Sequence, residues 1–172
     1  KINGSSFVLS GKVRPFLGKQ EATLDLKLNN IDLMQMKEYS PVPIGINLLS
    51  GYVDSNLQLI YTQEADQKTK MVLSGNTSLR KFKIENKATK EPYNINFEQL
   101  DVMLIDVDLS GKKPAELVME LVGASLVHLG KEDPVIILPK LVINNIYIDS
   151  IQKNIVLGKV KLDQFKVSMH RK

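Results

Sequence analysis

Apolar and polar side chains alternate along much of this chain. In residues 22–28, alanine and leucine occupy every second position, with Thr23, Asp25 and Lys27 between them. The same two-residue period recurs in residues 53–61 and 165–170. Successive side chains of a strand point to opposite faces, so this period predicts strands with one apolar and one polar face. The apolar face of the resulting sheet must be covered by other parts of the chain or must itself bind something.

Turn-forming residues divide this pattern into strands. We predict strands at residues 7–16 and 22–30 with a turn at 17–19, and hairpins with polar loops at residues 64–69 and 87–92. Residues 100–109 are apolar on both faces, as expected of a central strand or of one that lines a groove. Further strands are predicted after residue 134, separated at residues 144–145, 152–154 and 158. Pro139 lacks an amide N–H, so its neighbourhood is a poor central strand.

A short helix is predicted after the second strand. Asn30 is suited to cap it, and Pro41 and Pro43 would end it after about two turns. Its apolar positions are Leu33, Met34 and Met36.

Residues 114–128 fit two structures. Leu117, Val118, Leu121 and Val122 have helical spacing, and Pro114 suits a first helical turn, so a helix is favoured. Leu117, Met119 and Leu121 also have the period of a strand. The pattern leaves both alternatives open.

Two distant segments share one spacing of glycine, leucine and phenylalanine. The first set is Gly75, Leu79, Phe82 and Ile84, and the second is Gly158, Leu162, Phe165 and Val167. In both, the three-residue step from leucine to phenylalanine interrupts the alternation and indicates a β-bulge that turns the strand. Chance similarity between two strand pairs is the alternative to a structural repeat.

Composition is that of one folded domain. The chain has 172 residues, 43% of them hydrophobic and 24% charged, which suits a single domain over residues 1–172. Its formal charge of +4 is spread over interleaved basic and acidic residues, so we expect no nucleic-acid partner. Because the chain opens without methionine, we expect a segment excised from a larger protein.

Candidate chemistry is sparse. Cysteine is absent, and the two histidines, His128 and His170, have no metal-ligand spacing around them. Asp106 and Asp108 would share one side of a strand, where a solvated face is favoured over a cation site, with Asp101 on the opposite side. The glycines form no phosphate-binding motif. We therefore expect no enzyme, no metal and no cofactor.

One succession of motifs resembles a known family. A strand with the pattern SGxxD begins at Ser50, and the following hairpin strand reaches Gly75. A LxxFxI segment begins at Leu79, and a strand of the LxVxLxDVDL kind spans residues 100–109. This order resembles the AsmA-like envelope proteins, particularly the branch known as domain of unknown function seven hundred forty-eight.

The resemblance implies a location and a function. It implies a segment that faces the periplasm of a Gram-negative cell, in a larger protein tethered to the inner membrane by an N-terminal anchor outside this chain. Such proteins are similar to bridge-like lipid-transfer proteins, whose curved sheet forms an apolar groove for phospholipid or another lipid. The family has no known catalytic residues, and none is carried over.

We predict a mainly β fold: a curved, largely antiparallel sheet, as a β-groove or half-barrel, with one or two short helices. The expected function is non-enzymatic conduction of lipid between membranes, or scaffolding of outer-membrane biogenesis. The alternative is a structural or adhesive β module of a cell-surface protein with a closed core. The residues predicted to face lipid or the core are Leu24, Leu26, Leu28, Leu57, Leu59, Tyr61, Val102 and Leu104.

Overall fold

A single antiparallel sheet forms nearly the whole molecule. The computed structural model describes residues 6–16, 19–39, 46–64, 68–110, 113–149 and 151–168. Strand accounts for 80% of the structure, and the sheet is open rather than closed. The elements are β1 (Ser6–Phe16), β2 (Lys19–Asp32), the 3₁₀ helix η1 (Leu33–Tyr39), β3 (Ile46–Glu64), β4 (Thr69–Asn86), β5 (Tyr93–Asp108), β6 (Ala115–His128), β7 (Ile136–Asp149), β8 (Asn154–Asp163) and β9 (Lys166–Val167). The predicted mainly β fold is confirmed.

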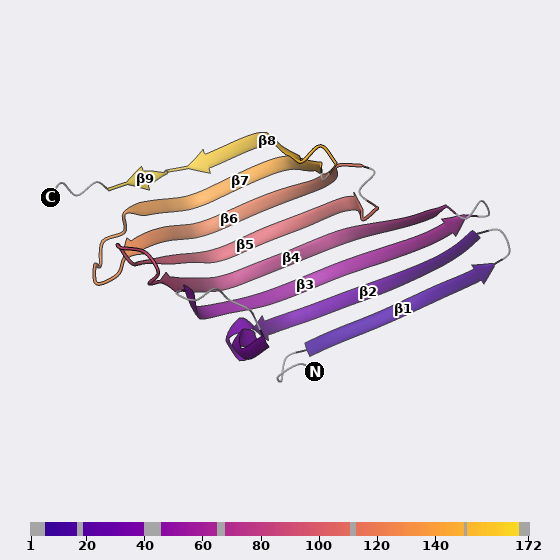
Figure 1. The fold of residues 1–172 in the computed structure, drawn as a ribbon, viewed down its shortest axis with the longest axis horizontal. Coiled ribbons are helices and arrows are strands. Elements are labelled where there is room, and N and C mark those ends of the chain that lie inside the picture. Colours follow the sequence, from indigo (N-terminus) through magenta and orange to yellow (C-terminus); the bar gives the residue numbers. More distant parts are fainter. Residues whose placement is uncertain are drawn as a thin grey trace.

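The strands follow one another across the sheet in chain order. Each of β1 to β8 pairs with its sequence neighbours, and the short β9 continues on β7 beyond the end of β8 (Figure 1). Every pairing is antiparallel. Strands β1 and β8 are therefore the two edges of the sheet.

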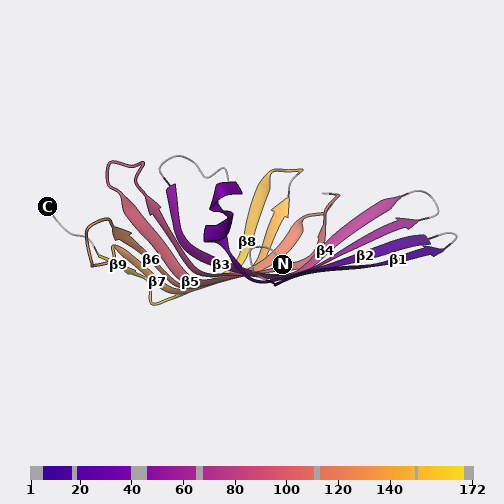
Figure 2. The same ribbon diagram turned by 90° about the horizontal axis from the view of Figure 1, so that it is seen from below.

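The sheet is bent into a trough. In Figure 2 the strand ends rise on both sides of a low centre, and η1 lies in the hollow between them. The trough thus runs across the strands, from the β1 edge toward the β8 edge, and the strand ends form its walls.

The position of η1 identifies the side chains of the concave face. A Cβ atom built on Gly51 would lie 3.1 Å from Leu33 Cδ1 and 3.2 Å from Phe82 Cδ2, so these groups share the face on which η1 lies. Val53 follows Gly51 by two residues and therefore points to the same face. Directly opposed residues of antiparallel strands also share a face, which extends the assignment across the sheet from strand to strand.

A line of backbone irregularities crosses five strands at one level. An apolar row of directly opposed residues flanks this line on each side. The row on one side is Ile31, Val53, Leu79, Leu100, Leu121, Leu141 and Leu162. The row on the other side is Leu48, Ile84, Ile95, Leu126, Ile136 and Val167. In every strand from β4 onward, five residues separate the two rows. We call this level the bend line.

Left-handed residues allow both rows to keep the concave face. An odd separation in a regular strand would place the two rows on opposite faces. Lys81, Gly123 and Gln164 lie on the bend line with φ values of 50°, 66° and 47°. Each inserts an extra step, so the alternation resumes on the same face. The bulges predicted at Leu79–Phe82 and Leu162–Phe165 are two points on this line.

The helix prediction for residues 114–128 is wrong. These residues form β6, which pairs with β5 on one side and β7 on the other. Leu117, Met119 and Leu121 then align with apolar residues of both neighbours. Partners on two sides satisfy the backbone and partly cover the strand's apolar side chains, which outweighs the intrinsic helix preference. The structure has one short helix, η1, in its described part.

The helix at residues 33–39 is confirmed as a 3₁₀ helix, but its predicted cap is wrong. The backbone N–H of Met34 donates to Asp32 Oδ1 at 2.9 Å, so Asp32 is the capping residue. Asn30 instead lies within β2 with φ 52°, at a bulge opposite β3. Pro41 and Pro43 lie outside the described residues.

Several predicted breaks in the last strands are also wrong. Asn145 lies within β7 as a left-handed bulge residue, and Gly158 lies within β8. Pro139 lies in β7, an interior strand. It falls on the bend line, between Lys140 and Leu138. Both of these residues pair with β6, whereas Pro139 between them does not, so an amide N–H is least needed there.

Candidate functional site

The concave face carries apolar rows that cross all eight long strands. One row of directly opposed residues is Leu9, Leu26, Leu57, Gly75, Leu104, Leu117, Ile146 and Leu157. The next is Phe7, Leu28, Ser55, Thr77, Val102, Met119, Ile143 and Val160. Neighbouring strands lie about 4.8 Å apart, so seven spacings give these rows a length of roughly 34 Å.

The eight residues predicted to face lipid or the core all lie on this face. Leu26, Leu57 and Leu104 belong to the first row, and Leu28 and Val102 to the second. The remaining three are Leu24, Leu59 and Tyr61, which extend the face toward the ends of β2 and β3. The strand register therefore places all eight residues on one face of the sheet.

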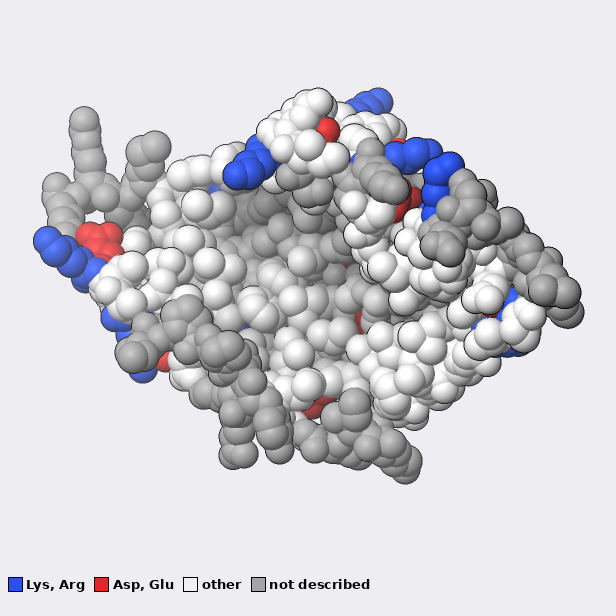
Figure 3. Space-filling model, turned by 45° about the vertical axis from the view of Figure 1, so that its right-hand side comes forward, with Lys and Arg blue, Asp and Glu red and all other residues white. Residues whose placement is uncertain are grey.

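Much of this face is uncovered. In the described residues, Ile31 and Ile143 are the buried hydrophobic side chains, and no large side chain is fully buried. Leu9, Leu24 and Leu157 remain 53%, 41% and 51% exposed. In Figure 3 the hollow is formed largely by uncharged residues, and lysine and arginine gather toward its rim. An apolar surface of this extent on a folded chain indicates a binding surface.

Helix η1 covers part of the trough. Leu33 lies over Gly51, and the ring of Phe82 approaches the same point. Phe82 also stacks on Phe97 across β4 and β5, with ring centroids 4.8 Å apart and an interplanar angle of 20°. Together these groups form the packed part of the concave face, beside the bend line.

One polar pair interrupts the apolar floor. The hydroxyl groups of Ser55 and Thr77 lie 2.7 Å apart and form a hydrogen bond with each other. Ser55 is 6% exposed. A buried hydroxyl without a partner would destabilise the sheet, so this mutual bond is what makes the pair compatible with an apolar floor.

The convex face is polar and hydrogen-bonded over β2 to β4, whereas β5 adds the exposed apolar side chains of Met103 and Ile105. Residues opposed across β2 to β5 include Asp25 with Gln58, and Asp54 with Ser78. Gln58 Nε2 donates to Asp25 Oδ1 at 2.8 Å, and Ser78 Oγ donates to Asp101. Because these side chains face water, polar residues alternate regularly with the apolar residues of the concave face in these strands.

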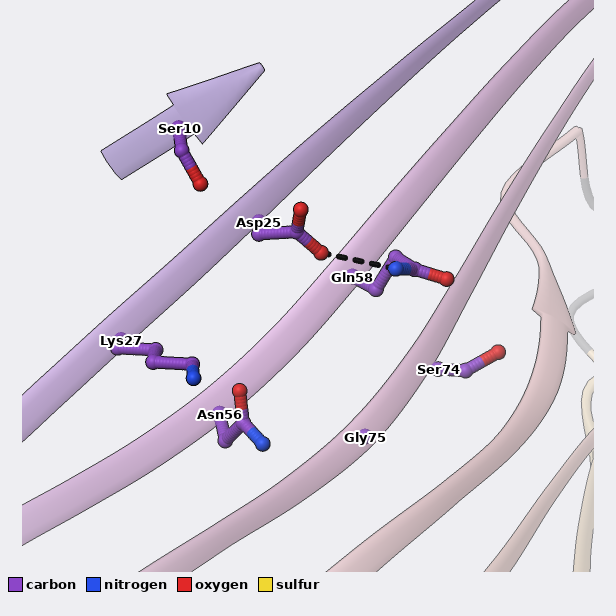
Figure 4. A pocket seen from close by; sticks show the side chains of 7 residues that line it. All are labelled: Ser10, Asp25, Lys27, Asn56, Gln58, Ser74 and Gly75. Carbon is purple, nitrogen blue, oxygen red and sulfur yellow. Dashed lines mark hydrogen bonds between the residues drawn. The ribbon is translucent and has the colours of Figure 1, made fainter. Parts of the chain in front are cut away.

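A shallow hollow on the convex face has a polar lining and is a candidate binding site. Figure 4 shows its side chains projecting from the strands around Gly75, with the bond between Asp25 and Gln58. Its lining consists of Ser10, Asp25, Lys27, Asn56, Gln58, Ser74 and Gly75. These are hydroxyl, amide, carboxylate and ammonium groups, which donate and accept hydrogen bonds.

The aspartates of β5 do not form a cation site. Asp106 has φ 47° at a bulge, and Ser74 Oγ donates to its Oδ1 at 2.7 Å. Asp108 instead accepts from the Ser110 N–H, in the turn after the strand. The bulge brings Asp106 to the same convex face as Asp101, so the prediction that these two lie on opposite sides is wrong. In the described residues, no group of three possible ligands could hold a metal ion.

Three basic residues, Arg80, Lys81 and Lys83, lie close together in β4, and the charge of Arg80 is neutralised by an ion pair. Arg80 Nε donates to Asp54 Oδ2 at 2.6 Å on the convex face. The Lys81 carbonyl accepts from Ser50 Oγ at 2.7 Å, which supports the bulge there.

At the end of β4, a hydrogen bond from Lys87 lowers the pKa of Glu85. His128 is half-exposed near Glu91, and His170 lies outside the described residues.

Fold and surface together define an open antiparallel β-trough with an apolar concave face and a convex face of mixed polarity. No helix of the described residues is long and apolar enough to cross a membrane. No protein-family model, curated protein or solved structure matches the chain.

Proposed function

We propose that the concave face holds the acyl chains of lipid and that the chain conducts lipid along the trough. This is a non-enzymatic role. The observation that carries the proposal is the pair of apolar rows that cross all eight long strands on an uncovered concave face. Shelter of acyl chains in this trough would remove both the chains and the exposed leucines from water.

The dimensions of the trough suit lipid. Its rows extend for roughly 34 Å, comparable with the roughly 30 Å thickness of the hydrocarbon core of a bilayer. Acyl chains that lie across the strands would contact the apolar rows along the whole length of each acyl chain. The head groups would remain in water at the charged rim. A phospholipid has this division into apolar chains and a charged head group.

The proposed setting follows from the resemblance of the motifs at residues 50–109 to AsmA-like proteins. In that setting the chain is a segment of a periplasmic protein anchored in the inner membrane, and it takes part in lipid transport for outer-membrane biogenesis. The rival role, an adhesive module with a closed core, is disfavoured by the open sheet and its exposed apolar rows.

Native mass spectrometry of the purified protein tests this proposal. We expect co-purified phospholipid on the wild-type chain. Leu57→Asp and Leu59→Asp each place a carboxylate on the concave face, where contact with acyl chains would desolvate it, so both variants should lose at least about 90% of that lipid.

The control is Asn56→Asp on the same strand. Asn56 is exposed on the convex face, so this variant adds the same charge without entering the trough and should retain its lipid. Circular dichroism must show that all three variants keep their strand content. Equal lipid retention by Leu57→Asp and Asn56→Asp would contradict a lipid site on the concave face.

A further inference from the structure

Strand β8 is an apolar edge with an unused side. Among the described strands it pairs along its length with β7 alone. All ten of its residues are exposed, including Ile155, Leu157, Val160 and Leu162 at 66%, 51%, 44% and 59%. A free edge presents backbone N–H and C=O groups that can pair with another strand.

The concave-face apolar positions of β8 are placed symmetrically about its centre, although the residues themselves differ. Ile155 and Leu157 lie before Gly158, and Val160 and Leu162 lie after Lys159. The three-residue step from Leu157 to Val160 lies at the midpoint. The strand ends are also matched, with Asn154 at one end and Asp163 at the other.

We infer that β8 is an interface for a second copy of this chain, in which the two β8 strands pair antiparallel about a two-fold axis perpendicular to the sheet. In the symmetric register, Ile155 opposes Leu162 of the second copy, and Leu157 opposes Val160. Val156 opposes Lys161, and Asn154 opposes Asp163. No two like charges are directly opposed.

The three-residue step from Leu157 to Val160 is what permits this register. A two-fold axis perpendicular to the sheet keeps both concave faces on one side. In a strictly alternating strand, pairing Ile155 with Leu162 would oppose residues from different faces, because their separation is odd. The extra residue between Leu157 and Val160 restores a common face. The two troughs would then form one continuous trough.

The other edge is less suited to the same contact. Strand β1 contains Pro15, which has no amide N–H to offer a partner strand. A closed two-fold dimer through β8 also avoids open-ended assembly, which pairing of β1 with β8 of the next copy would produce. The inference does not depend on the proposed lipid function, because it rests on the edge of the sheet alone.

Cysteine cross-linking tests the register directly, since the native chain has no cysteine. We expect an equimolar mixture of the single variants Val156→Cys and Lys161→Cys to form a disulfide-linked heterodimer under mild oxidation. Each variant alone should not cross-link, because identical positions would lie five residues apart along the pair, about 17 Å. Sedimentation velocity of the wild-type chain should give twice the mass of one chain.

The matched control mixes Val8→Cys with Lys12→Cys on β1, and it should not cross-link. A wild-type chain that stays monomeric at the concentration used for cross-linking overturns the inference. So does equal cross-linking of the mixed pair and of either variant alone. Circular dichroism establishes that the variants keep their fold. Lipid retention is measured separately, so failure of the interface and failure of the lipid site are distinguishable.

Discussion

Gly75 illustrates how closely two strands approach beneath the apolar face. Its φ is +133°, a conformation that side chains rarely adopt, and a Cβ atom there would lie 2.1 Å from the Asn56 carbonyl oxygen. The obstacle is backbone, which cannot rotate away. Glycine at this position therefore permits the pairing of β3 and β4 at the centre of the first row.

We predict that Gly75→Ala lowers the free energy of unfolding by about 2–4 kcal/mol, because it adds both backbone strain and a steric clash. Gly11→Ala is the control, since a Cβ atom there would be 3.4 Å from its nearest neighbour, an ordinary contact. It should change stability by about 0.5 kcal/mol or less. Urea titration followed by circular dichroism measures both, and equal losses would contradict this account.

At the scale of elements, the bend line determines the shape of the trough. Even-numbered strands carry left-handed residues on this line, at Lys81 in β4, Gly123 in β6 and Gln164 after β8. Their neighbours β5 and β7 pass the same level with the same three-residue step. The strands therefore change direction together, and the apolar rows on either side stay on one face.

Substitution of Lys81 tests whether the left-handed conformation is intrinsic to the bend. Glycine adopts φ 50° without strain, so Lys81→Gly should be neutral or stabilise the protein by up to about 1 kcal/mol. Lys83→Gly, two residues later in regular strand, should destabilise it by about 1 kcal/mol. Thermal unfolding compares the two, and equal destabilisation would mean that Lys81 is held in regular strand conformation.

At the scale of the whole molecule, none of the large side chains in the part of the chain that the structure describes is fully buried. Stability must come largely from ladder hydrogen bonds and from cross-strand contacts between half-exposed residues. A ligand that covers the concave face would add the burial that the chain itself lacks. Binding and stability should therefore be linked.

We predict that a lysophospholipid below its micelle concentration raises the melting temperature of delipidated protein. At about 100 times the dissociation constant, the gain is about 2.7 kcal/mol, or roughly 5–10 °C for a chain of this length. Leu57→Asp should show little of this rise, and Asn56→Asp should show all of it. Differential scanning calorimetry measures the shift, and an equal rise for both variants would place the lipid elsewhere.

Short-range patterns were sufficient to predict much of this architecture. The period of two gives the face of a strand residue from its immediate neighbours, which is why the eight residues predicted to face lipid or the core all lie on one face of the sheet. The leucine-to-phenylalanine steps likewise revealed two points of the bend line. Other points, such as Gly123 and Pro139, were missed because they carry no common local pattern.

Long-range pairing decided the rest. Residues 114–128 have both helical and strand periods, and only the presence of β5 and β7 on either side selects the strand. Pro139 and Asn145 resemble strand breaks, yet the ladder tolerates them where neighbouring strands bend or bulge at the same level.

The sequence by itself determined that this chain forms two-faced strands and which side chains share the apolar face, because alternation is a property of adjacent residues. Only the tertiary structure decided that the sheet stays open, that its apolar face lines a trough and that β8 is left as an edge. Those features depend on which strands pair and on what covers them, and both are relations between residues far apart in the chain.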